Sequence, residues 1–387
     1  MVLLSAPHRV FFATGMVTAL VSVIWWLVVY LWPGSSLSGM PLLMWHPWVM
    51  AMGVFSPFFY GFLMTTYPRW MDTAPISGRF YVPAAGLQLA GILMIVGGTL
   101  VSSVLVTVGL LVHLAGWSWA VAALVHVVRQ AEKVALHVWG TLPALILGAL
   151  IEVALLGVVH ETEWGRLWLL ARLWILLCMV PVFISVSHRM IPFFSRGVVA
   201  GYRFYRPDWA FWVLLACAAG LAVGELADLA LLRAGAGILL AATSGWLAVK
   251  WQPFRCMKPM LLGSLHVGFA WLPLAGLLMA LSPWAAGAWD AGFHALALGY
   301  FGSLLIAMVT RVTHGHSGRP LVMPPQVVAL FVLLQIAAIT RVAASLTGQL
   351  IGPATTLALM LFGAVVLLYV VRMLPIYLRP RLDGRAG

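Results

Sequence analysis

Twelve apolar stretches, most of them long enough to cross a bilayer, follow one another along the chain and are separated by short segments that contain prolines and glycines. About 20 consecutive apolar residues span the hydrocarbon core as an α-helix. A helix satisfies its own backbone hydrogen bonds in lipid, and none of these stretches alternates apolar and polar residues as a barrel strand would. The pattern therefore predicts an all-α, polytopic membrane helical bundle. We expect helices over residues 10–32, 45–67, 82–100, 103–128, 137–159, 167–193, 209–227, 235–251, 260–282, 289–311, 326–347 and 352–375.

The third and fourth predicted helices lie in one continuous apolar stretch, which is too long for a single span. We place the break at Ser102 and Ser103, shortly after Gly97 and Gly98, because glycine and serine favour turns and helix ends. Apolar spans fill the rest of the chain as well. We therefore expect a single integral membrane domain, residues 1–387.

Composition agrees with a membrane protein, because 63% of the 387 residues are hydrophobic and 8% are charged, against about 25% charged residues in soluble domains. With the N-terminus in the cytoplasm, all but four of the 22 Lys and Arg residues fall on the cytoplasmic side, as the positive-inside rule requires. The exceptions are Arg166, Arg172, Arg233 and Arg341. Both termini are therefore predicted to be cytoplasmic. The formal charge of +12 reflects this orientation and contact with anionic membrane lipid, not nucleic acid.

The three cysteines, Cys178, Cys217 and Cys256, are far apart and form no CxxC pair. A thioredoxin-like redox site and the CxxCH attachment of a c-type haem are therefore excluded. Cys178 and Cys217 lie in apolar stretches, where we expect them to be small buried side chains.

Histidine is enriched, with eleven histidines beside ten carboxylates. A lone histidine near a membrane surface is usually a hydrated polar group, and we expect this of His8, His126, His137 and His160. An unpaired ionisable group deeper in hydrocarbon is costly, so the deeper histidines are candidate functional residues; they are His46, His113, His188, His266 and His294. Neutral imidazole suits iron, copper and zinc. Carboxylates other than Glu152 are nearly absent at these depths, so a calcium or magnesium site is not expected.

Polar residues cluster after the tenth predicted helix, in the segment TRVTHGHSGRPL, residues 310–321. Ordinary loop chemistry accounts for its glycines but not for two histidines, His314 and His316, one residue apart. On the preceding helix, small residues recur every four positions; they are Ala291, Ala295, Gly299, Ser303 and Ala307. Such a face permits close helix packing, or it offers a flat wall for a planar macrocycle beside His294. The sequence leaves both interpretations open.

The stretch from 294 to 321, HALALGYFGSLLIAMVTRVTHGHSGRPL, resembles the signature of the NnrS family, bacterial inner-membrane proteins associated with the response to nitric oxide. Further similar stretches are PHRVFF (7–12), WHPWVMAMGVFSPFFYGFLMTTYPRW (45–70), HRMIPFFS (188–195) and LHVGFAWLPL (265–274). The resemblance covers essentially the whole chain. It implies a multi-pass protein of the bacterial inner (cytoplasmic) membrane that contains haem and copper and acts under nitrosative stress.

The resemblance also assigns individual positions. The residues that match histidines and arginines of the family are His46, His266, His294, His316, Arg311 and Arg319. The chain departs from the family pattern at Trp48 and Val49, which stand in place of a second histidine and a glutamate. If that pair binds copper in relatives, this protein binds copper differently or not at all. His188 stands where many relatives have glycine and is a candidate substitute ligand.

His294 and His316 are 22 residues apart, which corresponds to about 33 Å along a helix at about 1.5 Å per residue. One metal cannot bind both, so we expect two sites. In the outer site, His46 and His294 are candidate axial ligands of a b-type haem. The inner site, for a second haem or for copper, draws on His188, His266 and His316. Two arginines, Arg311 and Arg319, are candidates to pair with haem propionates. The alternative is that they only anchor the cytoplasmic side, as the positive-inside rule requires.

Three functions of different classes fit these features. The first is a haem protein that handles nitric oxide or another small diatomic, as an oxidoreductase supplied with electrons by a quinol or a cytochrome. The second is a membrane transporter, or a conduit for metal or haem, in which histidines are staging ligands; prolines inside the predicted helices favour it. The third is a non-catalytic sensor or sink for nitric oxide. The sequence identifies neither the catalytic residues nor the oligomeric state.

Overall fold

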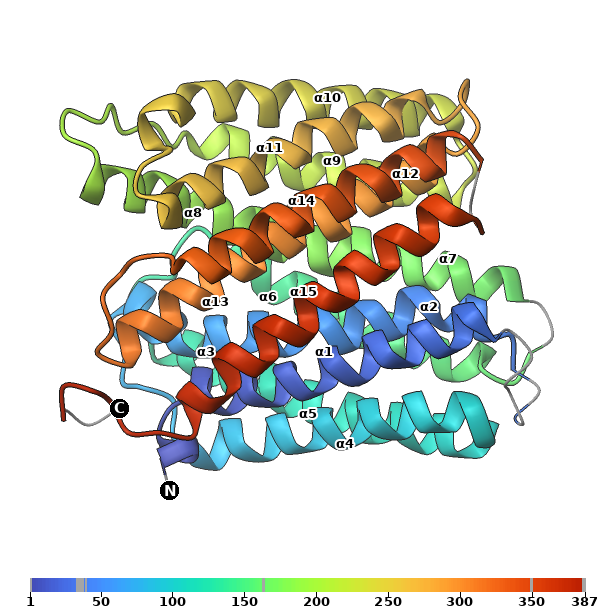
Figure 1. The fold of residues 1–387 in the computed structure, drawn as a ribbon, viewed down its shortest axis with the longest axis horizontal. Coiled ribbons are helices and arrows are strands. Elements are labelled where there is room, and N and C mark those ends of the chain that lie inside the picture. The colour runs from blue at the N-terminus through green and yellow to red at the C-terminus, as the bar shows by residue number, and fades with distance from the viewer. Residues whose placement is uncertain (1, 33–37, 39, 162–163, 349–350, 385–387) are drawn as a thin grey trace. The chain divides into compact units, whose positions relative to one another are not determined.

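The computed structural model describes residues 2–32, 38, 40–161, 164–348 and 351–384. Helices make up 83% of the structure and no strand is present in the described ranges, which confirms the all-α class. The α-helices are α1 Pro7–Leu31, α2 Leu42–Met50, α3 Ser56–Met71, α4 Gly78–Val101, α5 Ser103–Gln130, α6 Val138–Val158, α7 Trp164–Trp174, α8 Val180–Val198, α9 Asp208–Leu226, α10 Ala230–Lys250, α11 Met260–Leu281, α12 Ala288–His294, α13 Ser303–His316, α14 Pro325–Leu346 and α15 Pro353–Tyr377 (Figure 1). Three π-helical segments join α2 to α3, α7 to α8 and α12 to α13; they are η2 Ala51–Phe55, η3 Ile175–Met179 and η5 Ala295–Gly302. Two short 3-10 turns are η1 Val2–Ser5 and η4 Pro253–Cys256.

Twelve helical segments of the described residues are long and apolar enough to cross a membrane, which confirms the predicted number and order of spans. The chain is therefore a multi-pass membrane protein. The tenth span continues to His316, beyond the predicted end at 311. The helix continues through polar residues because the loss of apolar side chains does not end it. It ends just before Gly318, whose left-handed φ of 72° terminates a helix.

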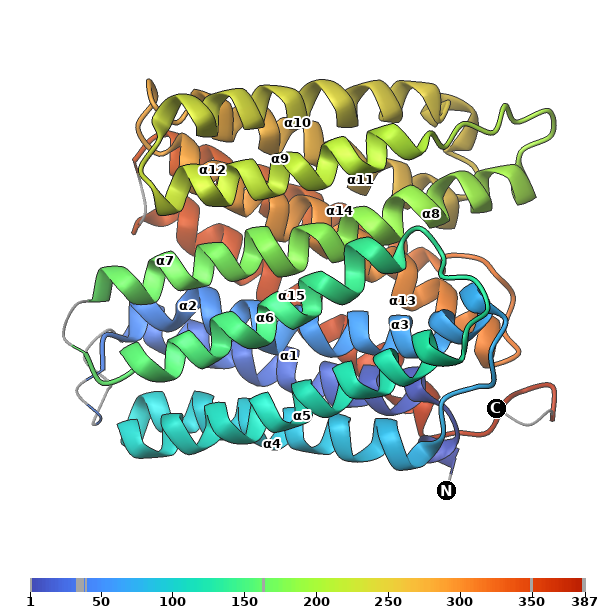
Figure 2. The same ribbon diagram turned by 180° about the vertical axis from the view of Figure 1, so that it is seen from behind.

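The break predicted between the third and fourth helices is confirmed. Ser102 has an extended backbone, with φ −163° and ψ 122°, between α4 and α5. The two helices lie side by side (Figure 2) and approach closely at glycines: a Cβ on Gly91 would lie 2.5 Å from the backbone nitrogen of His113. Small residues at such contacts let helix backbones approach one another in lipid.

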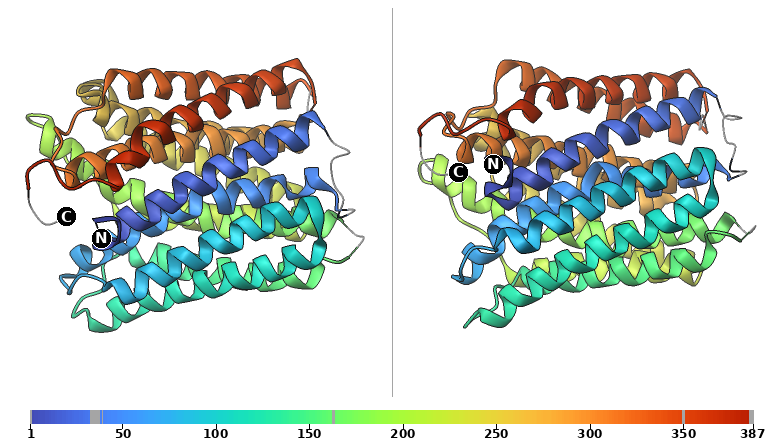
Figure 3. Two further views of the ribbon diagram at one scale, coloured as in Figure 1. Left: turned by 60° about the horizontal axis from the view of Figure 1, so that its bottom comes forward. Right: turned by 90° about the horizontal axis from the view of Figure 1, so that it is seen from below.

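The residues group into two compact units. Unit 1 comprises 1–178, 316–319 and 370–387, and unit 2 comprises 179–315 and 320–369. Within unit 1 the start of α1 lies beside the end of α15 (Figures 1 and 3), where the rings of Phe12 and Tyr377 pack edge to face with centroids 6.1 Å apart. The expectation of a single membrane domain over residues 1–387 stays a prediction.

In unit 2 the small-residue stretch of the tenth span is a packing surface. Because η5 is π-helical over eight residues, its small residues do not form one continuous α-helical face. The indole of Trp271 lies against Gly299, where an added Cβ would come within 2.2 Å of the ring. Trp271 also donates a hydrogen bond from Nε1 to Oε1 of Gln335, 2.8 Å away. The close-packing interpretation is confirmed at Gly299, and the protein's own indole, not a macrocycle, covers this position.

We expect Gly299→Ala to lower the stability of the protein by about 1–3 kcal/mol, because overpacking displaces a well-packed neighbour. The readout is thermal unfolding in detergent. Gly235→Ala is the matched control, because a Cβ there meets no atom within 4 Å and alanine favours the helix over glycine. Equal melting temperatures for the two variants would contradict the packing role of Gly299.

Candidate functional site

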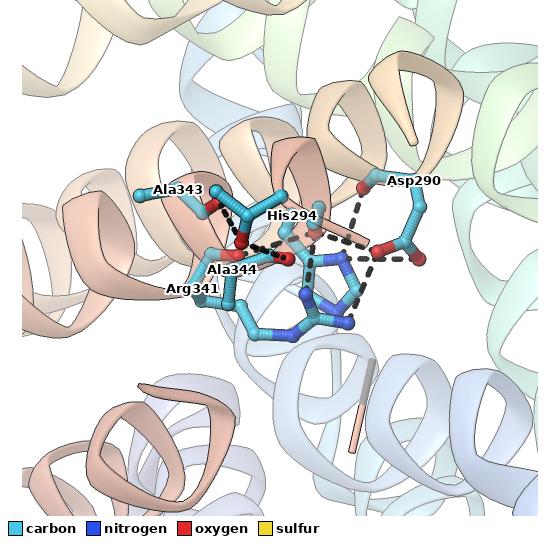
Figure 4. A network of polar contacts seen from close by, with 7 residues as sticks. Asp290, His294, Arg341, Ala343 and Ala344 are labelled. Atoms are coloured by element: carbon cyan, nitrogen blue, oxygen red, sulfur yellow. Dashed lines mark hydrogen bonds and ion pairs between the residues drawn. The ribbon is translucent and has the colours of Figure 1, made fainter. Parts of the chain in front are cut away.

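His294 is the last residue of α12 and directly precedes the π-helical η5. Its Nδ1 lies 2.9 Å from the backbone oxygen of Asp290 and 3.4 Å from Oδ1 of the same residue (Figure 4). A carbonyl oxygen can only accept, so Nδ1 donates, and in the neutral ring the lone pair is at Nε2. Metal-binding histidines are oriented in this way, by a carbonyl or a carboxylate behind the ring.

The carboxylate of Asp290 is held in turn by residues of α14. Nη2 of Arg341 lies 3.0 Å from Oδ2 of Asp290, and Oγ of Ser345 donates to the same oxygen at 2.6 Å (Figure 4). Arg341 also donates to Ser345. The network fixes the position of the carboxylate and, through it, the ring plane of His294. π-helical segments recur at functional sites, and His294 directly precedes one, so it is a candidate ligand position in unit 2.

Two further histidines of unit 2 have separate partners. His188 of α8 donates from Nε2 to the backbone oxygen of Pro207 at 3.2 Å and packs against the ring of Phe211. His266 of α11 has Nε2 3.0 Å from Oγ of Ser195. Because that hydroxyl donates to the backbone oxygen of Ile191, it accepts from His266. Both rings therefore present Nδ1 as the lone-pair atom, each with its own surroundings.

Two groups near Ser195 could in principle supply an anionic ligand. Burial raises the pKa of Tyr202 to about 12 and raises the pKa of the Cys256 thiol. Both groups lie outside the membrane spans and stay protonated at neutral pH. All three cysteines are buried and unpaired with one another, which confirms the expected burial of Cys178 and Cys217.

His46 of α2 belongs to unit 1 and stacks on Trp26, with ring centroids 3.8 Å apart and planes 29° apart. The stacking fixes the plane of the imidazole. The π-helical η2 begins five residues after it, a local arrangement similar to that of His294 and η5. The proposed pairing of His46 with His294 on one haem joins residues of different units and stays a prediction.

The segment 310–321 divides its two histidines between the units. His314 donates from Nδ1 to the backbone oxygen of Pro320 at 2.9 Å, which closes the loop after α13. His316 belongs to unit 1, where its ring lies 4.4 Å from that of His8 with the planes tilted by 46°. The segment 310–321 thus has one structural histidine, His314, and one, His316, that faces a second imidazole.

His8 is a correction to the sequence prediction. It was expected to be a hydrated surface group, but it is 2% exposed, with Nδ1 3.5 Å from Oγ1 of Thr65. His137 is also buried, at 1% exposed, whereas His126 and His160 are exposed as predicted. Helix α1 begins at Pro7, three residues before the predicted start, and so draws His8 into the packed span. The signal that could have identified His8 was its place in PHRVFF, one of the stretches that resemble the family.

A histidine and a glutamate meet in the middle of unit 1. Nδ1 of His113 in α5 lies 2.8 Å from Oε1 of Glu152 in α6, and both side chains are fully buried. Nε2 of His113, Oε2 of Glu152 and the hydroxyl of Tyr60 are buried without a hydrogen-bond partner among the described residues. The sequence singled out both members of this pair by depth but not their contact.

The two candidate arginines have different surroundings. The guanidinium of Arg311 lies over the ring of Phe194, 3.7 Å from its centroid, which is a cation–π contact within unit 2. Arg319 belongs to unit 1, with Nη1 buried and without a partner in the described part of the chain. A role for either in binding haem propionates stays a prediction.

The described residues contain no group of three His, Cys, Asp or Glu side chains that could hold one metal ion. His188 and His266 have separate partners in unit 2, and His316 lies in unit 1. A site built from one or two histidines is what these residues offer in this arrangement.

The fold and its buried histidines define a polytopic helical membrane protein with donor groups for a metal or a haem. The family model described as NnrS protein matches residues 2–381. The chain therefore belongs to the NnrS family, as the sequence resemblance predicted. None of the curated proteins compared with the chain matches it.

We expect His113→Ala to destabilise the protein by about 3 kcal/mol or more, because it leaves Glu152 buried without its partner. The double variant His113→Leu/Glu152→Leu should recover most of this loss, since it removes both polar groups. Unfolding in detergent gives the free energies, and His126→Ala, an exposed histidine on the same helix, is the control. A double variant as unstable as the single one would argue against a coupled pair.

Proposed function

We propose that this NnrS-family protein binds a b-type haem through buried histidines in the membrane and handles or responds to nitric oxide. His294 is the residue that would hold the haem iron. The observation that supports it most is the hydrogen bonding of its Nδ1 to Asp290, which leaves the lone pair on Nε2. A carboxylate behind the ring raises the basicity of the ligand nitrogen and fixes its direction.

The donor set fits haem better than a metal ion held by side chains alone. The porphyrin supplies the equatorial donors, so haem needs only one or two histidines. Copper or zinc held by protein usually needs three or four convergent ligands, and no such group is found in the described residues. Copper stays a further candidate on the family resemblance. The other proposed ligands are His46, His188, His266 and His316.

When bound, the haem iron would supply a position at which nitric oxide binds. This chain's own residues would hold and orient the group: His294 as ligand, Asp290 behind it, and Arg341 keeping Asp290 in place. If the protein turns nitric oxide over, it acts as an oxidoreductase and requires an electron donor, for which a quinol or a cytochrome is the proposed class. Without turnover it is a sensor or a sink.

A transporter or conduit for metal or haem is the second candidate. Three spans are interrupted by π-helical segments, η2, η3 and η5, and broken helices line the binding sites of many transporters. Haem that co-purifies and stays bound favours the first function, whereas a protein without haem that moves metal across vesicle membranes favours the second.

We also propose the bacterial inner membrane as the location, with both termini cytoplasmic. Three of the four arginines that oppose the positive-inside rule have acidic partners: Arg166 lies 3.0 Å from Glu161, Arg233 lies 3.6 Å from Glu225, and Arg341 lies 3.0 Å from Asp290. Their charges are locally balanced and therefore weigh little in the topology.

This topology predicts that a fluorescent protein fused to the C-terminus is fluorescent in cells, because the fusion stays in the cytoplasm and such proteins do not mature on the periplasmic side. An alkaline phosphatase fused at the same point should be inactive, because it too stays in the cytoplasm. An active phosphatase fusion together with a dark fluorescent fusion would reverse the assignment.

For the haem proposal, we expect the detergent-purified protein to show a Soret band, and His294→Ala to lose most of it. Asp290→Asn should weaken haem affinity about 10- to 100-fold, as loss of an outer partner does at metal-bound histidines. His126→Ala is the matched control and should retain full haem. A colourless wild-type protein, or unchanged occupancy in His294→Ala, would overturn the assignment. Single alanine variants of His46, His188, His266 and His316 test the remaining ligands, and consumption of nitric oxide with added reductant separates an enzyme from a sink.

A further inference from the structure

Four arginines from distant parts of the sequence gather in unit 1. They are Arg9 of α1, Arg69 of α3, Arg319 of the segment after α13, and Arg381 of the C-terminal tail. Arg319 and Arg381 interact electrostatically with Arg9. Arg9, Arg69 and Arg381 likewise interact electrostatically with the rings of both His8 and His316. We call these four arginines the cationic cluster.

The cationic cluster is only partly neutralised. Asp383 binds Arg381 through both carboxylate oxygens, at 2.8 and 2.6 Å, and these hydrogen bonds raise the pKa of Arg381. A guanidinium stays protonated at any physiological pH. Among the described residues, Asp383 is the carboxylate that binds an arginine of the cluster, and its single charge does not balance four guanidiniums.

Two N–H groups of the cluster are buried and have no acceptor among the described residues. Arg9 is 2% exposed; its Nη1 donates to the backbone oxygens of Tyr377 and Arg379 at 3.2 and 3.0 Å, and its Nε has no partner there. Nη1 of Arg319 is likewise buried without one. Buried donors of native proteins nearly always have an acceptor, so both point to a ligand with acceptor atoms.

The backbone around Arg319 is fixed by the C-terminal tail. The amide of Leu382 donates to the backbone oxygen of Ser317 at 3.0 Å, and Nη1 of Arg381 donates to that of His316 at 3.2 Å. Gly318 has a φ of 72°, and a Cβ there would lie 2.9 Å from Cγ of Asp383. Glycine is therefore required between Ser317 and Arg319.

The imidazole rings of His8 and His316 contact each other beside the cationic cluster. Two histidines in contact would normally suggest a metal ion, but the positive charges of Arg9, Arg69 and Arg381 act on both rings and make binding of a free cation there less favourable. The same charges favour an anion, and the planar guanidinium fork matches the geometry of an oxyanion.

We propose that the cationic cluster binds a small oxyanion of the nitrite, nitrate or phosphate type, with Nε of Arg9 and Nη1 of Arg319 as the buried donors. A free inorganic anion and the phosphate of a lipid headgroup share this chemistry. The site goes beyond haem binding, since it requires neither His294 nor a metal.

The test uses the full-length protein in detergent, titrated with sodium nitrite, sodium nitrate and inorganic phosphate against sodium chloride at equal ionic strength, with binding followed by calorimetry. We expect at least one oxyanion to bind saturably where chloride does not. Arg319→Gln should weaken that binding about tenfold or more, because it removes a charge-assisted hydrogen bond. Arg69→Gln removes an exposed charge of the cluster without loss of packing, and should weaken binding as well. Arg372→Gln, an exposed arginine of α15 in the same unit, is the matched control and should bind as the wild type does.

Native mass spectrometry of the same samples distinguishes the sources. A phospholipid that is retained by the wild type and by Arg372→Gln but lost from Arg319→Gln identifies a lipid phosphate as the oxyanion. Saturable binding of an added anion without retained lipid identifies a free one. Binding that is equal for chloride, or unchanged in both Arg319→Gln and Arg69→Gln with no lipid lost, overturns the proposal. The proposed function is tested separately, by the Soret band of the wild type and of His294→Ala, so failure of one proposal is distinguishable from failure of the other.

Discussion

Hydrocarbon offers no hydrogen-bond partner, so a polar group inside a span of this protein needs one from the chain. The buried indole of Trp117 donates to the backbone oxygen of Leu145 at 2.8 Å, and Arg233 on a predicted outer end is held beside Glu225. Polar side chains that bond to another helix in this way tie two segments together. The polar contacts therefore position helices as much as they satisfy individual groups.

The same constraint explains why the histidines are so informative. An imidazole that donates from one nitrogen to a fixed acceptor has a defined tautomer, and its other nitrogen then has a defined direction. Hydrogen bonds to Asp290, Pro207 and Ser195 set the tautomers of His294, His188 and His266 respectively. The chemistry available at each ring is therefore decided by a neighbour, which lies on the same helix for His294 and on another segment for His188 and His266.

Because the role of each histidine depends on its neighbours, the sequence could predict the spans but not these contacts. Apolar run length predicted twelve spans and the break at Ser102, because hydrophobic thickness acts on each segment separately. The burial of His8 was not predictable in this way, since it follows from its contact with His316, more than 300 residues away. Nor could periodicity reveal that η5 is π-helical, because the small residues in it fit an α-helical repeat equally well. The pairing of His113 with Glu152 likewise depends on how α5 and α6 pack.

His294 differs from His8 and His316 in the charges around the ring, although all three side chains are the same. His294 has a carboxylate behind it and one guanidinium beyond that, an arrangement that makes its outer nitrogen a better donor to a positive centre. His8 and His316 have the same side chain but lie among guanidiniums, which oppose a positive centre and favour a negative one. A count of histidines is therefore not by itself a count of candidate metal ligands. The sign of the charge around each ring indicates better whether the ring favours a positive or a negative ligand, because hydrocarbon screens that charge far less than water would.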